Sequence, residues 1–141
     1  MILFTTIDIK APNFKRRKIQ KWIKKISVTF QKKAGDIAFI FCSNEKIIEI
    51  NRIYLSHNYY TDIITFDYSV ETIISGDIFI SVDTVQANAV LYNTTFNQEL
   101  YRVIIHGILH LCGLKDDNPE NKKLMRQHED KALEDLEKFS I

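Results

Sequence analysis

The spacing of hydrophobic residues predicts strands and helices in alternation along this chain. Residues 2–9 and 36–42 are rich in β-branched and aromatic residues without a helical period, and they are expected to form strands. From Asn13 onward, apolar residues recur every three or four positions, which indicates an amphipathic helix between these strands. Its apolar positions are Ile19, Trp22, Ile23, Ile26 and Phe30. Polar residues at 43–45 can cap a second helix.

The second half of the chain continues the same alternation. Residues 61–68 and 76–82 are rich in Ile and Phe and predict two further strands, with a connection long enough for a hairpin. A helix is expected over residues 83–91. A capping box of Thr and Gln opens a strongly apolar helix over residues 95–112. Pro119 is typical of the first turn of a last helix.

These elements predict an α/β (α+β) fold, with a single small mixed sheet of about four strands packed by about five helices. The chain has 141 residues, 45% of them hydrophobic, which excludes a disordered chain and is enough for one packed core. With no repeat or linker-like stretch, residues 1–141 are expected to form a single domain. No apolar run approaches the ~20 residues of a membrane span, and no basic segment precedes the apolar start. A cytoplasmic protein with reduced thiols and no membrane partner is expected.

Charge is unevenly distributed, although 19 basic residues nearly balance 18 acidic ones. Ten basic residues and no acidic ones fall between residues 10 and 33, and eight acidic residues lie from Asp116 onward. On the first helix, five cations share the face opposite Trp22 and Ile26: Arg17, Lys18, Lys21, Lys24 and Lys25. Such a face is usually only solvated, but it also fits single-stranded RNA or a ribosomal partner.

The candidate chemistry lies at the end of the apolar helix. His106 and His110 are four residues apart, so both imidazoles project from one helix face about a turn apart. Gly113 permits a sharp reversal of the chain, after which Asp116 can return to the same ion. This pattern predicts a zinc site with three protein ligands and a fourth position open to water. Asp117 is an alternative ligand, or it caps the last helix.

Other interpretations of the two histidines have to be compared with a zinc site. A His-x-x-x-His pattern often arises by chance, and zinc peptidases with this spacing place a glutamate where this chain has Gly107. A zinc peptidase therefore remains an alternative function for this chain, although the glutamate that would act as its general base is missing. A second alternative is a non-catalytic ribosome-associated factor whose zinc is structural. In that case His128 would be the fourth ligand. His128 also fits a packed core position, on the apolar side of the last helix with Leu124 and Leu133, and Cys112 fits a small buried hydrophobic residue.

Four ordered sequence blocks resemble the YbeY family of single-strand-specific endoribonucleases. The family carries a segment like Leu-Asn-x-x-Tyr-Arg-x-Lys-Asp-x-x-Thr-Asp-Val-Leu-Ser-Phe, then Gly-Asp-Ile-x-Ile-Ser, then His-Gly-x-Leu-His-Leu-x-Gly-Tyr-Asp-His. The matching blocks here are Asn51-Arg52-Ile53-Tyr54, Thr61-Asp62-Ile63-Ile64-Thr65-Phe66, Gly76-Asp77-Ile78-Phe79-Ile80-Ser81 and His106-Gly107-Ile108-Leu109-His110-Leu111-Cys112-Gly113. The four blocks occur in the order of the family, and the resemblance that rests on them covers most of the chain.

The resemblance implies a zinc-dependent endoribonuclease that acts on ribosomal RNA, in 16S rRNA 3′-end maturation and ribosome quality control. It implies one Zn²⁺ per chain, with Asp116 in place of the family's third histidine. The arginine of the family's RNA cleft aligns with Leu55, so His57 or Arg102 becomes a candidate for that role, unless both are ordinary surface residues. Asp117 and His57 are the candidates for moving a proton.

Overall fold

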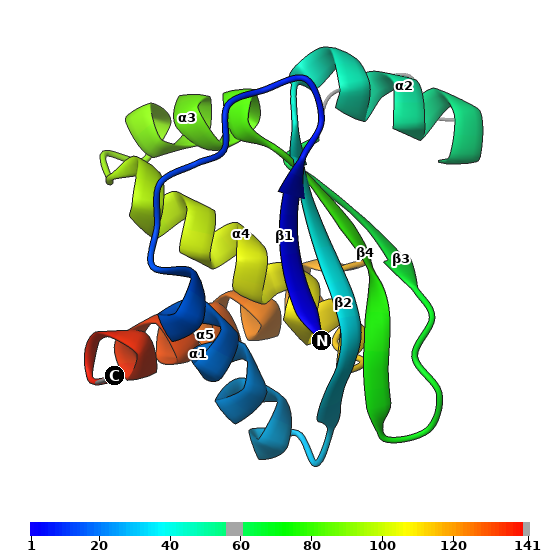
Figure 1. Cartoon of the computed structure of the whole chain (residues 1–141). Coiled ribbons are helices and arrows are strands. Elements are labelled where there is room, and N and C mark those ends of the chain that lie inside the picture. Colours follow the sequence, from blue (N-terminus) through cyan, green and yellow to red (C-terminus); the bar gives the residue numbers. More distant parts are fainter. Residues whose placement is uncertain (56–60, 140–141) are drawn as a thin grey trace.

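The computed structural model describes residues 1–55 and 61–139, and in this part of the chain strands and helices alternate as predicted (Figure 1). The elements are β1 (Ile2–Thr6), α1 (Arg16–Thr29), β2 (Lys33–Cys42), α2 (Asn44–Leu55), β3 (Ile63–Asp67), β4 (Ile73–Ser81), α3 (Val82–Leu91), α4 (Phe96–Leu111) and α5 (Pro119–Glu137). One mixed sheet of four strands with five helices confirms the predicted α/β fold class. None of the helices described is both long enough and apolar enough to cross a membrane.

The strand order is β1-β2-β4-β3. β1, β2 and β4 run parallel, whereas β3 is the antiparallel edge strand. Because a parallel pair needs a crossover, α1 connects β1 to β2. β3 and β4 form the predicted hairpin, in a register that pairs Ile63 with Ile80 and Asp67 with Gly76.

Residues alternate between the two faces of the sheet, and each face has its own core. The larger core lies on the face covered by α1 and α4, with α5 packed outside them (Figure 1). Among its fully buried side chains are Trp22, Phe39, Ile78 and Ile104. A smaller core lies under α2 and contains Ile47, Ile50, Ile64 and Cys42. The asymmetry leaves α4 between the sheet and α5, where its side chains can contact both.

α5 presents a different stripe to the core from the predicted one. Its buried residues are Met125, Glu129, Ala132 and Leu136. Leu124 is 47% exposed, so its predicted core position is wrong. His128 is half-buried, with its ring edge-on to Phe30 at 5.3 Å between centroids. The buried stripe is shifted by one position because α5 packs against α1 as well as α4, with the Trp22 indole N–H donating to the Ala132 carbonyl at 2.9 Å.

Candidate metal centre

α4 carries the two histidines on a flank of its buried face. The predicted cap is confirmed, since the Thr95 hydroxyl accepts the backbone N–H of Gln98 at 3.1 Å. Nine residues of the helix are buried against the sheet and its neighbours. His106 and His110 lie at the edge of this face with 19% and 28% of their side chains exposed. Both rings therefore stand at the boundary between core and solvent, where a bound ion remains accessible to a substrate.

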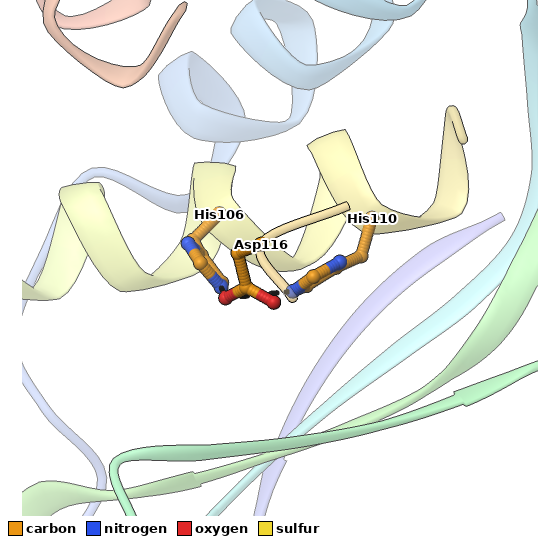
Figure 2. Close-up of side chains that lie close together, drawn as sticks. All are labelled: His106, His110 and Asp116. Carbon is orange, nitrogen blue, oxygen red and sulfur yellow. Dashed lines mark ion pairs between the residues drawn. The ribbon is translucent and has the colours of Figure 1, made fainter. Parts of the chain in front are cut away.

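The structure brings His106, His110 and Asp116 together, and Figure 2 shows their polar ends converging beside α4. The Asp116 Oδ2 atom lies 3.3 Å from His106 Nε2 and 3.6 Å from His110 Nε2. Donor atoms on a tetrahedral zinc ion with bonds near 2.0–2.1 Å are about 3.3 Å apart. The separations fit one small ion that binds all three donors, and among the described residues no other group of three His, Cys, Asp or Glu side chains meets this criterion.

Both imidazoles are oriented by a hydrogen bond on the opposite ring nitrogen. His110 Nδ1 donates to the Leu114 carbonyl at 3.0 Å, and His106 Nδ1 donates to Glu129 Oε2 at 2.6 Å. Carbonyl and carboxylate oxygens only accept, so in each ring the proton lies on Nδ1. Each Nε2 then faces Asp116, and in the neutral ring it offers a lone pair to a metal ion, as metal ligation requires.

The turn after α4 has a local cause in Gly113. Its φ of +105° is unfavourable for any residue with a Cβ. The Gly113 N–H donates to the His110 carbonyl and the Leu114 N–H to the Leu109 carbonyl, both at 3.0 Å, which is a Schellman ending. This turn presents the Leu114 carbonyl to His110 and brings Asp116 back toward both histidines.

Glu129 of α5 is a site residue that the sequence interpretation missed. It is 5% exposed, and its second oxygen, Oε1, accepts from Arg102 Nη1 at 3.0 Å. The same Nη1 atom binds Asp130 at 3.0 Å, and Arg102 Nε lies 3.9 Å from the buried Glu99. The sequence did carry a signal for Glu129. It is an acidic residue on the apolar stripe of α5, four residues after Met125 and three before Ala132. The guanidinium of Arg102 is thus largely engaged with acids, and its predicted contact with RNA stays a prediction.

Burial and charge shift the pKa values of His106, Asp62 and Glu99. Burial alone would lower the pKa of His106, but the hydrogen bond and negative charge of Glu129 outweigh it, and the pKa is raised. The pKa of Asp62 is raised by burial, an effect that the nearby His106 partly offsets. Burial also raises the pKa of Glu99, which Arg102 opposes. The histidine is therefore surrounded by carboxyl groups, an environment that attracts a cation.

Grooves lie on two sides of the three donors. One of about 550 Å³ is lined by His110, Leu55 and Lys115 together with residues of β3. The other, of about 230 Å³, is lined by His106, Asp116 and Asp62. Leu55, where the resemblance implied an arginine, thus lies in the groove beside His110. A third groove of about 1000 Å³ shares Tyr92, Glu99, Arg102 and Arg126 with the second and extends to Lys18 of α1.

Asp117 and the predicted basic residues of α1 are not among the three converging donors. Asp117 is exposed and accepts the side-chain N–H of Asn121 at 2.7 Å, and this hydrogen bond lowers its pKa. The predicted helix cap is provided by Asn118, whose side chain accepts the N–H of Asn121. His57 is outside the described residues. Of the basic residues on α1, Lys18 is half-buried, and Arg17, Lys21, Lys24 and Lys25 are exposed.

Three residues bear on the rival interpretations. Gly107 lies where α4 approaches the sheet, and an added Cβ would come within 3.0 Å of Ile63 and Ile78. A peptidase-type glutamate at that position would require both isoleucine side chains to shift. His128 is absent from the donor group, and Cys112 is buried in the core, as predicted, with burial raising its pKa to about 11. The geometry of this part of the chain supports three protein donors.

The fold and the site define the chain as a small α/β protein with three converging donors that could bind a metal ion. The family model described as Endoribonuclease YbeY matches residues 5–137. The chain therefore belongs to the YbeY family, and the predicted resemblance is confirmed.

Relatives and a solved structure agree with this assignment. The chain is 53% identical over 132 residues to an endoribonuclease YbeY of Parabacteroides distasonis, covering 94% of this chain and 93% of the relative. It is 53% identical over 135 residues to that of Azobacteroides pseudotrichonymphae, covering 96% and 97%. A solution structure of a Thermotoga maritima protein matches with a TM-score of 0.66 at 27% identity, covering 96% of this chain and 89% of that one.

Proposed function

We propose that this chain is a zinc-dependent endoribonuclease that cleaves single-stranded RNA, with the ion held by His106, His110 and Asp116. The observation that carries the proposal is the convergence of three donor atoms, with each imidazole held through Nδ1 so that its Nε2 faces Asp116, in a chain of the YbeY family. When bound, the ion supplies Lewis acid chemistry that polarises a phosphoryl oxygen or makes a water molecule more acidic.

The protein's own groups would bind and orient the RNA strand. Because grooves flank the donors on both sides, a single strand can cross the site, whereas a duplex is wider and stiffer. Lys115 and Lys122 line these grooves and can contact phosphates, as can the N–H groups of Arg102 that acids leave available. The exposed cations of α1 would extend the contact through the groove that Lys18 lines.

Proton transfer is proposed for a carboxylate or imidazole near the scissile bond. Asp117 and His57 are the candidates that the sequence offers. Asp62 joins them because it lines the same groove as His106 and Asp116, and its raised pKa favours accepting a proton, whereas the lowered pKa of Asp117 disfavours it. The proposed substrate is ribosomal RNA, in 16S rRNA 3′-end maturation and ribosome quality control. The place of action would then be the cytoplasm, with the single domain of residues 1–141 binding the ribosome or its proteins.

The test compares RNA cleavage and metal content in the same preparations. Wild-type protein should contain about one zinc ion per chain and should cleave an unstructured RNA faster than a stable hairpin, with casein uncut as a control substrate. His110→Ala and Asp116→Ala should each lose most of the metal and at least about a hundredfold in cleavage rate, as expected when a metal ligand is removed. Equal cleavage by wild type and His110→Ala would indicate a contaminating nuclease and contradict the proposal. Stoichiometric metal in Asp116→Ala would exclude that ligand.

A further inference from the structure

Glu129 joins the candidate metal centre to the interface between α4 and α5. Its carboxylate bridges two partners on α4: Oε2 accepts from His106 Nδ1 at 2.6 Å and Oε1 accepts from Arg102 Nη1 at 3.0 Å. Arg126 Nη1 also approaches Oε1 at 3.5 Å from within α5. Only 7% of the Glu129 side chain is exposed. A buried carboxylate with a partner on each oxygen has one orientation, and that orientation fixes the imidazole plane of His106.

We infer that Glu129 is a positioning residue that makes His106 a strong metal ligand, and that Arg102 holds Glu129 in place. This inference rests on the proposed metal site and adds to it a residue from outside the donor set. The negative charge next to Nδ1 increases the electron density that Nε2 can donate to a cation. The ring also needs no reorientation before binding, so less conformational entropy is lost.

Two variants of Glu129 test this role, because each removes a different property of its carboxylate. In Glu129→Gln the amide has one oxygen and one NH₂ group, so it can accept from His106 or from Arg102 but not from both. Glu129→Asp keeps the charge and both oxygens but is shorter by one methylene, so it cannot reach both partners. Asp130→Asn is the matched control. Asp130 is exposed and binds the same Arg102 Nη1 atom at 3.0 Å, whereas the hydrogen bond from α5 to His106 comes from Glu129.

The measurement is the dissociation constant for Zn²⁺, from competition with a chromophoric chelator at pH 7.5, together with the thermal unfolding of each metal-free protein. Glu129→Gln should bind Zn²⁺ about tenfold to a hundredfold more weakly than wild type, the usual range when a partner of a ligating histidine is removed. Glu129→Asp should lie between the two, and Asp130→Asn should bind like wild type. Glu129→Asp also serves if Glu129→Gln does not fold.

The outcomes separate this inference from the proposed function. If wild type binds no Zn²⁺, the proposed metal-dependent function is wrong. If wild type binds Zn²⁺ and loses it in His110→Ala, but Glu129→Gln and Glu129→Asp bind as tightly as wild type, the role of Glu129 is overturned. A lower melting temperature with unchanged affinity would likewise overturn it, because it would mean that Glu129 only holds α5 against α4. Weakened binding in Asp130→Asn equal to that in Glu129→Gln would overturn the specific contact with His106.

Discussion

Gly113 shows how one residue governs two ligands of the candidate metal centre. Its backbone lies at φ +105°, and the turn it makes sets both the Leu114 carbonyl that orients His110 and the return of Asp116. A Cβ at Gly113 would meet no atom within 4 Å, so conformational strain alone opposes a substitution. The glycine is therefore required for its backbone and not for space.

Gly113→Ala should lower the free energy of unfolding by about 1–3 kcal/mol, the cost of holding a residue with a Cβ in this conformation. Zn²⁺ affinity should fall as well, because relief of the strain moves the Leu114 carbonyl. Urea denaturation of metal-free protein and the chelator competition would measure the two effects. Lys115→Ala, two residues further on and exposed, is the control for stability. Equal stability of Gly113→Ala and wild type would contradict this account.

At the scale of elements, α4 and α5 share the site between them. α4 provides both imidazoles and Arg102, while α5 provides Glu129, which lies on its buried stripe. Packing of the two helices therefore aligns the hydrogen bond that orients His106. Asp116 lies in the short segment that connects α4 to α5, and this connection brings it to the two histidines. The interface is thus part of the chemistry as well as part of the core.

α1 is the element for which a surface role can be tested most directly. Lys21, Lys24 and Lys25 are exposed on it, and Lys25 Nζ lies 5.6 Å from the ring centre of Phe139. If this face binds RNA, reversing the three charges to Glu should flatten the salt dependence of binding. Each lost phosphate contact should reduce the slope of log K against log salt by about 0.7 for a single strand.

The control is an equal charge reversal on α5. Lys123 and Lys131 of α5 and Lys138 at its C-cap are exposed, so changing them to Glu alters the net charge by the same amount at another place. Binding of unstructured RNA to a catalytically inactive His110→Ala background, measured between low and moderate salt, compares the two triple variants. Equal slopes would mean that the α1 face is only solvated.

For the whole molecule, the candidate metal centre ties together segments that unfolding would separate. His106 lies in α4, Asp116 follows α4, and Glu129 lies in α5, which in turn packs on α1 through Trp22. An ion that binds only the folded chain stabilises it according to its free concentration relative to its dissociation constant. Metal binding should therefore raise the free energy of unfolding of the whole chain.

At a free Zn²⁺ concentration of one hundred times the dissociation constant, the free energy of unfolding should rise by about 2.7 kcal/mol. The corresponding increase in melting temperature is several degrees for a chain of this size. Differential scanning calorimetry with and without a chelator measures the shift, and Asp116→Ala should show almost none. A shift of the same size in Asp116→Ala would mean that the ion binds elsewhere.

Local periodicity was enough to predict much of the fold and the donor set. The helical period places His106 and His110 on one face whatever surrounds them, and Thr95, Gly113 and Pro119 mark helix ends through their own backbone chemistry. The two-residue alternation of the strands follows from the same kind of short-range rule. These features depend on residues a few positions apart, so the sequence alone determines them.

Only the tertiary structure decided how the elements meet. The strand order, the rotation of α5 that buries Glu129 and exposes Leu124, and the use of Arg102 as a partner for acids depend on contacts between distant segments. Glu129 reaches His106 across 23 positions of the chain, a separation for which no local period exists. The sequence determined which groups could bind a metal ion, and helix packing decided that Glu129 orients His106, because this contact forms only when the whole core is assembled.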